Sequence, residues 1–254
     1  MYYKYKDFIS QISKNASQRN DLVVPLNSVS LGKYENNVYI NGELYHATDT
    51  FHTHLAQRLD IPMPYYRKML SNSKKLLQTN VNHWLNSFPS NKQVLLRSYI
   101  EPNKESSRFL RWNSEKLIAR GLLSNRYKIM DNQELFYDLQ YIIDDFEVKS
   151  VYHNDEITNV KIQFPKLEGE IRKGDVVTGG IVLRNSELGF SSISATSLIY
   201  RLVCDNGMML PNVSAINSKY HIGKPITVSK FSSKSIKQDY ELPENLTSDI
   251  CNMM

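Results

Sequence analysis

The sequence has little cysteine and no long apolar run. Only Cys204 and Cys251 occur among 254 residues, and one bridge would add little to a chain with 41% apolar side chains, so we expect two reduced thiols. No apolar stretch approaches the roughly 20 residues that span a bilayer, and the polar N-terminus lacks the apolar centre of a signal peptide. We therefore expect a soluble, cytoplasmic protein without membrane contact.

Sequence motifs of several enzyme classes are also missing. The chain contains no GxxxxGK[ST] loop, no GxGxxG, no HExxH and no paired CxxC, so we expect no cofactor and no metal. The acids Asp131, Glu134, Glu187 and Asp205 are scattered and form no motif. A metal-dependent nuclease is therefore the weaker alternative, and the sequence leaves the question of an enzyme open while favouring none.

One histidine cluster has to be weighed as a metal site. His46, Asp49, His52 and His54 lie within nine residues, but no second cluster offers the missing ligand at a standard spacing. We favour histidines that are exposed to solvent or cap a helix.

Apolar spacing in the first half predicts helices with one hairpin. Residues 51–59 and 65–70 have helical spacing, and prolines 62 and 64 place a corner between them. Asn41-Gly42 predicts a type I′ turn between strands at 37–40 and 43–47. The segment also resembles a helix-turn-helix, with Tyr66, Arg67 and Lys68 facing outward, but plain helix packing is favoured.

The second half alternates with a period of two. This pattern within residues 148–164, 175–184 and 193–203 predicts a mainly antiparallel sheet, and residues 131–146 predict a helix packed across it. The fold class is therefore α+β. We expect a single domain over residues 1–240, with a possible sub-boundary near 88–104 and a loosely held tail at 241–254.

Charge is unevenly distributed along the chain. The whole protein carries a net charge of +5, and residues 104–128 alone hold seven cations against two acids, which is also +5. Arginines alternate there with aromatic residues, as in grooves where phosphates meet cations and bases stack on rings. The candidate nucleic-acid-binding residues are Arg108, Arg111, Trp112, Lys116, Arg120, Arg126, Tyr127 and Lys128. The alternative is a solvated basic face whose rings belong to the core.

Three segments carry a family resemblance. Residues 51–62 with 65–70 and 82–85, residues 120–132 (RGLLSNRYKIMDN), and the pair RNSELG at 184–189 and YRLVCDNGM at 200–208 resemble a family with a domain of unknown function found in bacteriophages and plasmids. The resemblance spans about residues 47–209. It supplies no catalytic residues, and Asn125 stands where the family usually has Asp. Its turn residues here are Asn185, Ser186, Gly189, Arg201, Asn206 and Gly207.

The resemblance implies a mobile-element protein with a role in replication or recombination. Together with the basic segment, it predicts a sequence-nonspecific nucleic-acid-binding protein, with single-stranded DNA as the partner, acting in the host cytoplasm if a phage carries the gene. A homo-oligomer is compatible with the sequence. The alternative is a protein-interaction module that inhibits or mimics a host factor through the acidic residues 138–156.

Overall fold

Two compact units make up the described part of the chain. The computed structural model describes residues 2–34, 36–101, 116–142, 145–170, 173, 176–201 and 208–219. Among the described residues, unit 1 combines those up to Ala16 with those from Lys128 to Lys219, and unit 2 lies within Ser17–Tyr127. Each unit has its own sheet and its own apolar core. The chain thus passes between units at 16/17 and 127/128. The single domain over residues 1–240 stays a prediction, and the tail at 241–254 lies outside the described residues.

Unit 2 is built on a six-stranded sheet with the order β2-β6-β7-β5-β4-β3. Neighbouring strands are antiparallel except for β5 and β7, which run parallel. The strands are β2 (Leu22–Pro25), β3 (Val29–Leu31), β4 (Asn37–Ile40), β5 (Glu43–Ala47), β6 (Gln93–Glu101) and β7 (Lys116–Ser124), and a short 3-10 turn, η1 (Leu26–Ser28), joins β2 to β3.

The hairpin of β4 and β5 confirms the turn expected from Asn41-Gly42. Both residues have positive φ, 51° and 83°, as a type I′ turn requires. The resulting register pairs Ile40 with Glu43. Val38 and Ile40 therefore face the core, while Tyr39 is exposed.

Three helices complete unit 2: α2 (Asp49–Arg58), α3 (Met63–Asn72) and α4 (Lys74–Ser87). Thr48 caps α2, because its hydroxyl accepts a hydrogen bond from the Phe51 N–H at 3.2 Å. Pro62 precedes α3 and a second proline occupies its first turn, where the missing N–H is tolerated. The predicted corner between the two helices is thus confirmed.

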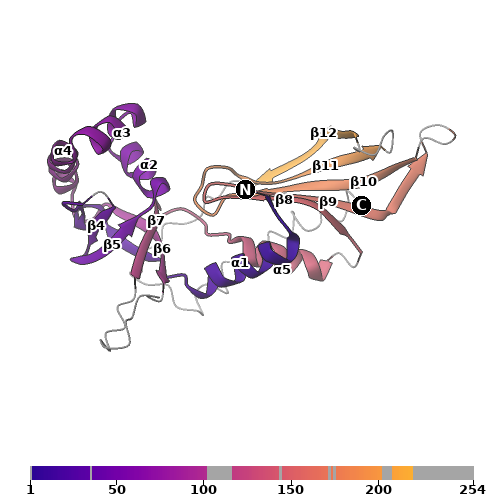
Figure 1. Ribbon diagram of the computed structural model, residues 1–254, viewed down its shortest axis with the longest axis horizontal. Helices are drawn as coiled ribbons and strands as arrows, with labels where there is room; N and C mark the ends of the chain where they lie inside the picture. Colours follow the sequence, from indigo (N-terminus) through magenta and orange to yellow (C-terminus); the bar gives the residue numbers. More distant parts are fainter. Residues whose placement is uncertain are drawn as a thin grey trace. The chain divides into compact units, whose positions relative to one another are not determined.

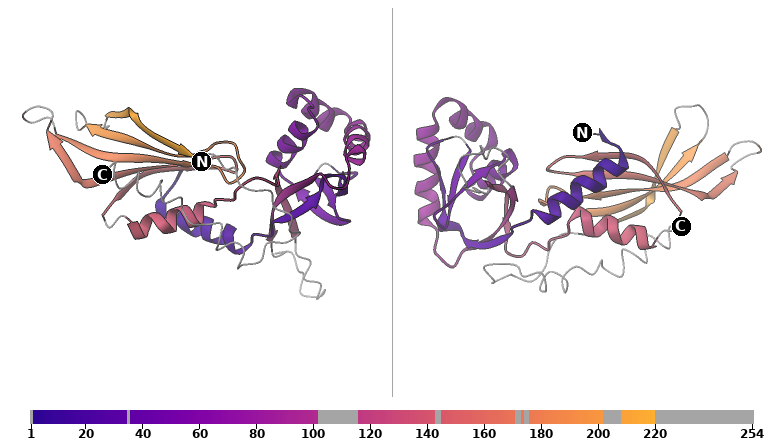
Figure 2. Two further views of the ribbon diagram at one scale, coloured as in Figure 1. Left: turned by 180° about the vertical axis from the view of Figure 1, so that it is seen from behind. Right: turned by 60° about the horizontal axis from the view of Figure 1, so that its bottom comes forward.

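Unit 1 has a six-stranded antiparallel sheet with the order β1-β8-β9-β10-β11-β12. Figures 1 and 2 show two helices, α1 (Tyr5–Ser17) and α5 (Asn132–Ile142), side by side on one face of it. Phe8 of α1 packs edge to face on Phe136 of α5, with ring centroids 5.2 Å apart. The strands are β1 (Tyr2–Tyr3), β8 (Glu147–His153), β9 (Thr158–Glu170), β10 (Val176–Asn185), β11 (Ile193–Arg201) and β12 (Met208–Lys219).

The α+β class is confirmed, as are the antiparallel sheet of the second half and the helix packed across it. The expectation of a helical first half with one hairpin is right only in part, because that half also carries a six-stranded sheet. Strands such as β2 and β3 have four and three residues, too few for alternation to reveal them. None of the described helices has the length and apolar character needed to cross a membrane.

Candidate nucleic-acid interface

The described part of the central basic segment does not form one surface. Lys116 begins β7 and is exposed, whereas Arg126 is exposed two residues beyond the end of that strand. A nine-residue strand spans roughly 30 Å at about 3.3 Å per residue, so these two cations lie far apart. Arg108, Arg111 and Trp112 lie outside the described residues.

Two members of the segment are buried in unit 2. Arg120 is 4% exposed, and its guanidinium carbon lies 4.3 Å from the centre of the Tyr99 ring. Tyr127 is 7% exposed, and Lys128 is half-buried. Arg120 lies in the middle of β7, a central strand between β6 and β5, where its guanidinium group packs on the Tyr99 ring of β6. The interpretation of Arg120 as a phosphate ligand and of Tyr127 as a stacking ring is therefore corrected.

A different stretch of unit 2 has the charge that a polyanion needs. Residues 61–100 contain no Asp or Glu, although six Lys and Arg residues occur there. Four of the cations lie on the helices α3 and α4, and all four are exposed: Arg67, Lys68, Lys74 and Lys75. The nearest acids in the sequence are Asp60 and Glu101, which flank the stretch. A concentration of exposed cations attracts phosphates.

Hydrogen bonds to β3 fix the orientation of α4. The side-chain amides of Gln78 and Asn82 both donate to the Leu31 carbonyl at 3.0 Å, and Asn82 Oδ1 accepts from the Leu31 N–H at 2.7 Å. The same side of the helix buries Leu77 and Val81 in the core. The opposite side is thereby held toward the solvent.

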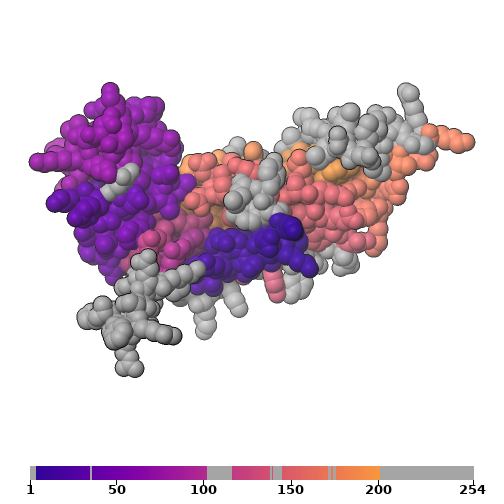
Figure 3. Space-filling view, in the orientation of Figure 1, coloured from indigo at the N-terminus to yellow at the C-terminus, as the bar shows by residue number. Residues whose placement is uncertain are grey.

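Two large exposed rings occur on the same two helices. Tyr65 on α3 is 50% exposed and Trp84 on α4 is 52% exposed. In the space-filling view these helices form the outer part of unit 2 at the upper left (Figure 3). We call this set the helical basic surface; it consists of Tyr65, Arg67, Lys68, Lys74, Lys75 and Trp84. The density of cations along the sequence does not reveal this set, because its local signal is the absence of acids.

The histidine cluster belongs largely to the interior of unit 2. His54 Nδ1 accepts a hydrogen bond from the Leu122 N–H at 3.1 Å, and His52 Nδ1 lies 2.8 Å from the Tyr66 hydroxyl. His52 and His54 are buried, so the expectation of exposed or capping histidines is wrong for both. His46 is half-buried, and burial, followed by the charge of Lys116, lowers its pKa. No group of three metal-binding side chains occurs among the described residues.

The same contacts bear on whether α2 and α3 can act as a DNA-binding helix-turn-helix. Tyr66 is fully buried against His52, so it cannot reach a base from α3. Burial raises the pKa of its hydroxyl, which therefore stays neutral. Only Arg67 and Lys68 of that trio are exposed. They can contact phosphates, which carry no sequence information.

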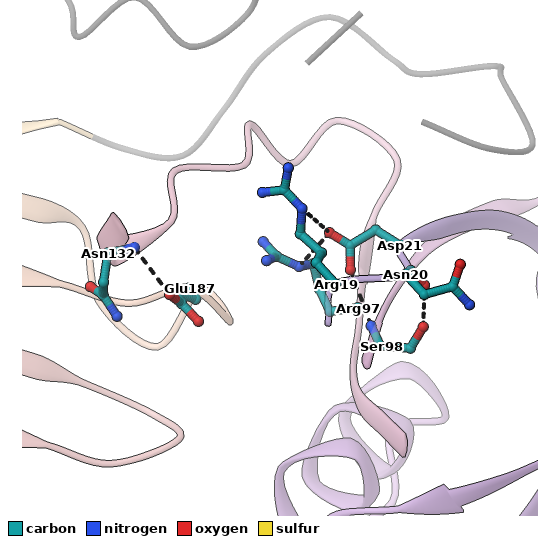
Figure 4. Close-up of polar contacts among 7 residues, drawn as sticks. All are labelled: Arg19, Asn20, Asp21, Arg97, Ser98, Asn132 and Glu187. Carbon is teal, nitrogen blue, oxygen red and sulfur yellow. Dashed lines mark hydrogen bonds and ion pairs between the residues drawn. The ribbon is translucent and has the colours of Figure 1, made fainter. Parts of the chain in front are cut away.

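A buried ion pair joins two strands of unit 2 (Figure 4). Arg97 Nε lies 3.0 Å from Asp21 Oδ2, and the two side chains are 1% and 3% exposed. Arg19 Nε lies 3.9 Å from the same oxygen, and its side chain is 13% exposed. Asp21 Oδ1 accepts from the Ser98 N–H at 3.1 Å, and the Ser98 hydroxyl donates to the Asn20 carbonyl. The group fixes the start of β2 against β6.

The first family-motif turn clamps the start of α5 in unit 1. Asn185 is fully buried, and its Nδ2 donates to the Met130 carbonyl and to Asn132 Oδ1, both at 3.0 Å. Glu187 Oε1 accepts from the Asn132 N–H at 3.0 Å (Figure 4). A carboxylate at a helix N-terminus also stabilises the helix dipole. These contacts give the turn a structural role.

The next residues of the turn make hydrogen bonds that stabilise the loop itself. The Ser186 hydroxyl donates to the Glu156 carbonyl at 2.6 Å and accepts from the Phe190 N–H at 2.9 Å. Gly189 has φ of 78°, which favours glycine. Arg201 ends β11, whereas Asn206 and Gly207 lie outside the described residues.

The structure also locates several acidic residues on which the two alternative functions, a metal-dependent nuclease and a protein-interaction module, would depend. Asp131 and Glu187 are buried, and the structure gives a metal-dependent nuclease no ligand cluster among its described residues. In the acidic segment, Glu147 pairs with Lys149 at 2.6 Å and Asp145 with Lys166 at 3.3 Å. These exposed pairs reduce the local excess of negative charge.

Comparison with known proteins identifies one family. Residues 119–222 match a family described as a domain of unknown function (DUF932), which confirms the expected domain of unknown function. The matched region includes the second part of β7, α5 and the strands β8–β12, and it contains the turn at 185–189. No curated protein and no solved structure matches the chain significantly. The helical basic surface lies outside the matched region.

Proposed function

We propose that the protein binds nucleic acid without sequence preference, with single-stranded DNA as its partner, through the helical basic surface of unit 2. The observation that carries this proposal is the coincidence of four exposed cations and two half-exposed rings on helices that contain no acid. A role in recombination or replication rests on the family resemblance and belongs to the same proposal.

The chemistry of the surface suits a single strand. Arg67, Lys68, Lys74 and Lys75 would neutralise phosphates, which releases counterions and favours binding at low salt. Tyr65 and Trp84 would accept unpaired bases, and each such stack contributes roughly 1 to 3 kcal/mol. Bases of a duplex are already stacked on each other, so the rings favour the single strand.

The test is a titration of a labelled oligothymidine, followed by fluorescence anisotropy over a series of salt concentrations. We expect dissociation constants near 10⁻⁴ to 10⁻⁶ M, the usual range of nonspecific binding. Neutralising four phosphate-binding cations (R67Q, K68Q, K74Q and K75Q together) should reduce the slope of log K against log salt by up to about 3, at about 0.7 per phosphate.

Two controls separate this surface from the net charge of the protein. K4Q with K6Q removes two exposed cations of unit 1, one just before α1 and one in its first turn, and should change the affinity far less than K74Q with K75Q. W84A should weaken binding at every salt concentration without changing the slope, because stacking releases no counterion. Absence of any binding at tens of micromolar protein in low salt, or equal effects of the two lysine pairs, would refute the proposal.

A further inference from the structure

The face of the unit 1 sheet opposite α1 and α5 carries a hollow of about 400 Å³. Residues alternate along each strand, so those next to the core residues Val160, Ile181 and Ala195 point to this other face. The lining consists of Ser150, Tyr152, Asn159, Lys161, Val182, Arg184, Ser194, Thr196 and Leu198. None of these nine residues is acidic.

Strand register brings the two cations of the hollow together. Asn159 lies opposite Arg184 and Lys161 lies opposite Val182, so Lys161 and Arg184 are diagonal neighbours on β9 and β10. Such neighbours have Cα atoms about 7 to 8 Å apart, and long side chains reach across that distance. Both cations can therefore contact one bound anion.

Arg184 is held in place. Its Nε donates to Asn159 Oδ1 at 3.1 Å, which leaves the two terminal nitrogens of the guanidinium group for a ligand. A planar guanidinium binds a phosphate through two parallel hydrogen bonds, and fixing it beforehand reduces the entropy lost on binding.

The rest of the lining suits the remainder of a nucleotide. Hydroxyls of Ser150, Ser194 and Thr196 can bond to sugar or base polar groups, while Val182 and Leu198 provide an apolar floor. A volume of about 400 Å³ falls within the range of small-ligand sites. Charge, hydrogen-bonding groups and apolar area are thus combined in one place.

We infer that the hollow on the outer face of the unit 1 sheet binds one nucleotide through its phosphate, with Lys161 and Arg184 as the phosphate ligands. The nucleotide can be free or part of a strand, because both present the same phosphate, sugar and base. The site lies in unit 1 and does not depend on the helical basic surface.

The experiment compares three ligands on the full chain: thymidine monophosphate and inorganic phosphate by calorimetry, and labelled oligothymidine by anisotropy. R184Q should weaken binding of the monophosphate about tenfold, the effect of losing a hydrogen bond to a charged group, and K161Q should act in the same direction. The matched control is K166Q, which removes an exposed cation from the same strand, outside the lining of the hollow. Unchanged circular dichroism of each variant shows that the sheet is intact.

The outcomes separate the two sources of the nucleotide. Loss of monophosphate binding in R184Q and K161Q supports a free nucleotide, and loss of oligothymidine binding alone supports a nucleotide within a strand. The inference is overturned if K166Q has the same effect as R184Q, if neither ligand is affected, or if inorganic phosphate binds as tightly as the monophosphate. Variants of the helical basic surface should leave monophosphate binding unchanged. Failure of this inference can therefore be distinguished from failure of the proposed function.

Discussion

Replacing Asp21 with asparagine tests the buried ion pair of unit 2. The variant keeps the shape of the side chain and an oxygen that can accept from the Ser98 N–H, but it removes the negative charge 3.0 Å from Arg97 Nε. Arg97 is 1% exposed, so its charge stays buried without that carboxylate. Removing one partner of a buried pair destabilises by roughly 3 to 5 kcal/mol, and we expect about 3 because the acceptor survives.

Urea denaturation followed by tryptophan fluorescence measures the effect. Both tryptophans, Trp84 and Trp112, fall within Ser17–Tyr127, so their signal reports on unit 2. A loss of about 3 kcal/mol moves the midpoint by about 1 to 3 M urea at ordinary slopes. The control is E101Q, which neutralises an exposed acid at the end of β6 and should change stability by less than about 0.5 kcal/mol.

A second variant separates charge from packing. Combining D21N with R97M removes the two most deeply buried charges, and we expect part of the stability to return because the charge that remains, on Arg19, is on a side chain 13% exposed to solvent. The reasoning is refuted if D21N behaves like E101Q, or if the double variant is no more stable than D21N alone.

Three further predictions concern unit 1. N185L leaves the Met130 carbonyl without its partner and should lower stability by roughly 2 to 4 kcal/mol, with faster hydrogen exchange in α5; unchanged exchange there would contradict the clamp. G180A places a Cβ 2.4 Å from the Ile162 carbonyl oxygen and should destabilise by about 1 to 3 kcal/mol, whereas G169A meets no atom within 4 Å and should be nearly neutral when both are compared by thermal unfolding followed by circular dichroism. Burial raises the pKa of Tyr200 to about 12, so the unfolded chain ionises first and stability falls as pH rises from about 10 to about 12; Y200F should lose less over that range, and equal losses would refute the assignment.

Local chemistry made several parts of the fold predictable. The Asn41-Gly42 turn, the two prolines at the start of α3 and the apolar spacing of α5 each act within a few residues, so the sequence alone contains the necessary information. Alternation in β8–β11 was equally readable, because one face packs on α1 and α5 while the other faces away from them.

The burial of polar side chains in unit 2 depends on contacts between residues that are far apart in the sequence. Arg120 appears as one more cation of a basic segment, yet β7 lies between β6 and β5 and the side chain ends under the Tyr99 ring. His52 and His54 are buried by contacts with residues 14 and 68 positions away, Tyr66 and Leu122. Exposure of a side chain depends on such distant partners, so no local pattern assigns it.

The sequence does contain a local signal for the helical basic surface, namely a long stretch without acidic residues. Counting cations favours the stretch at 104–128, but a search for segments without acids selects residues 61–100. Such a segment has a high local density of positive charge, which favours contact with phosphates when its helix is exposed. Which side of α4 is exposed still required the bonds to Leu31.

Strand β1 pairs Tyr2 with Tyr152, and α1 packs on α5, although all of unit 2 is encoded between them. During synthesis the ribosome therefore releases the whole of Ser17–Tyr127 before the partners of the first helix exist. Phe8 and Ile12 must wait in contact with water, or with a chaperone, until the later strands emerge. The order of translation thus allows residues 17–127 to fold first. A ribosome stalled after residue 127 would present an amphipathic N-terminal segment without the helix and strands on which it packs.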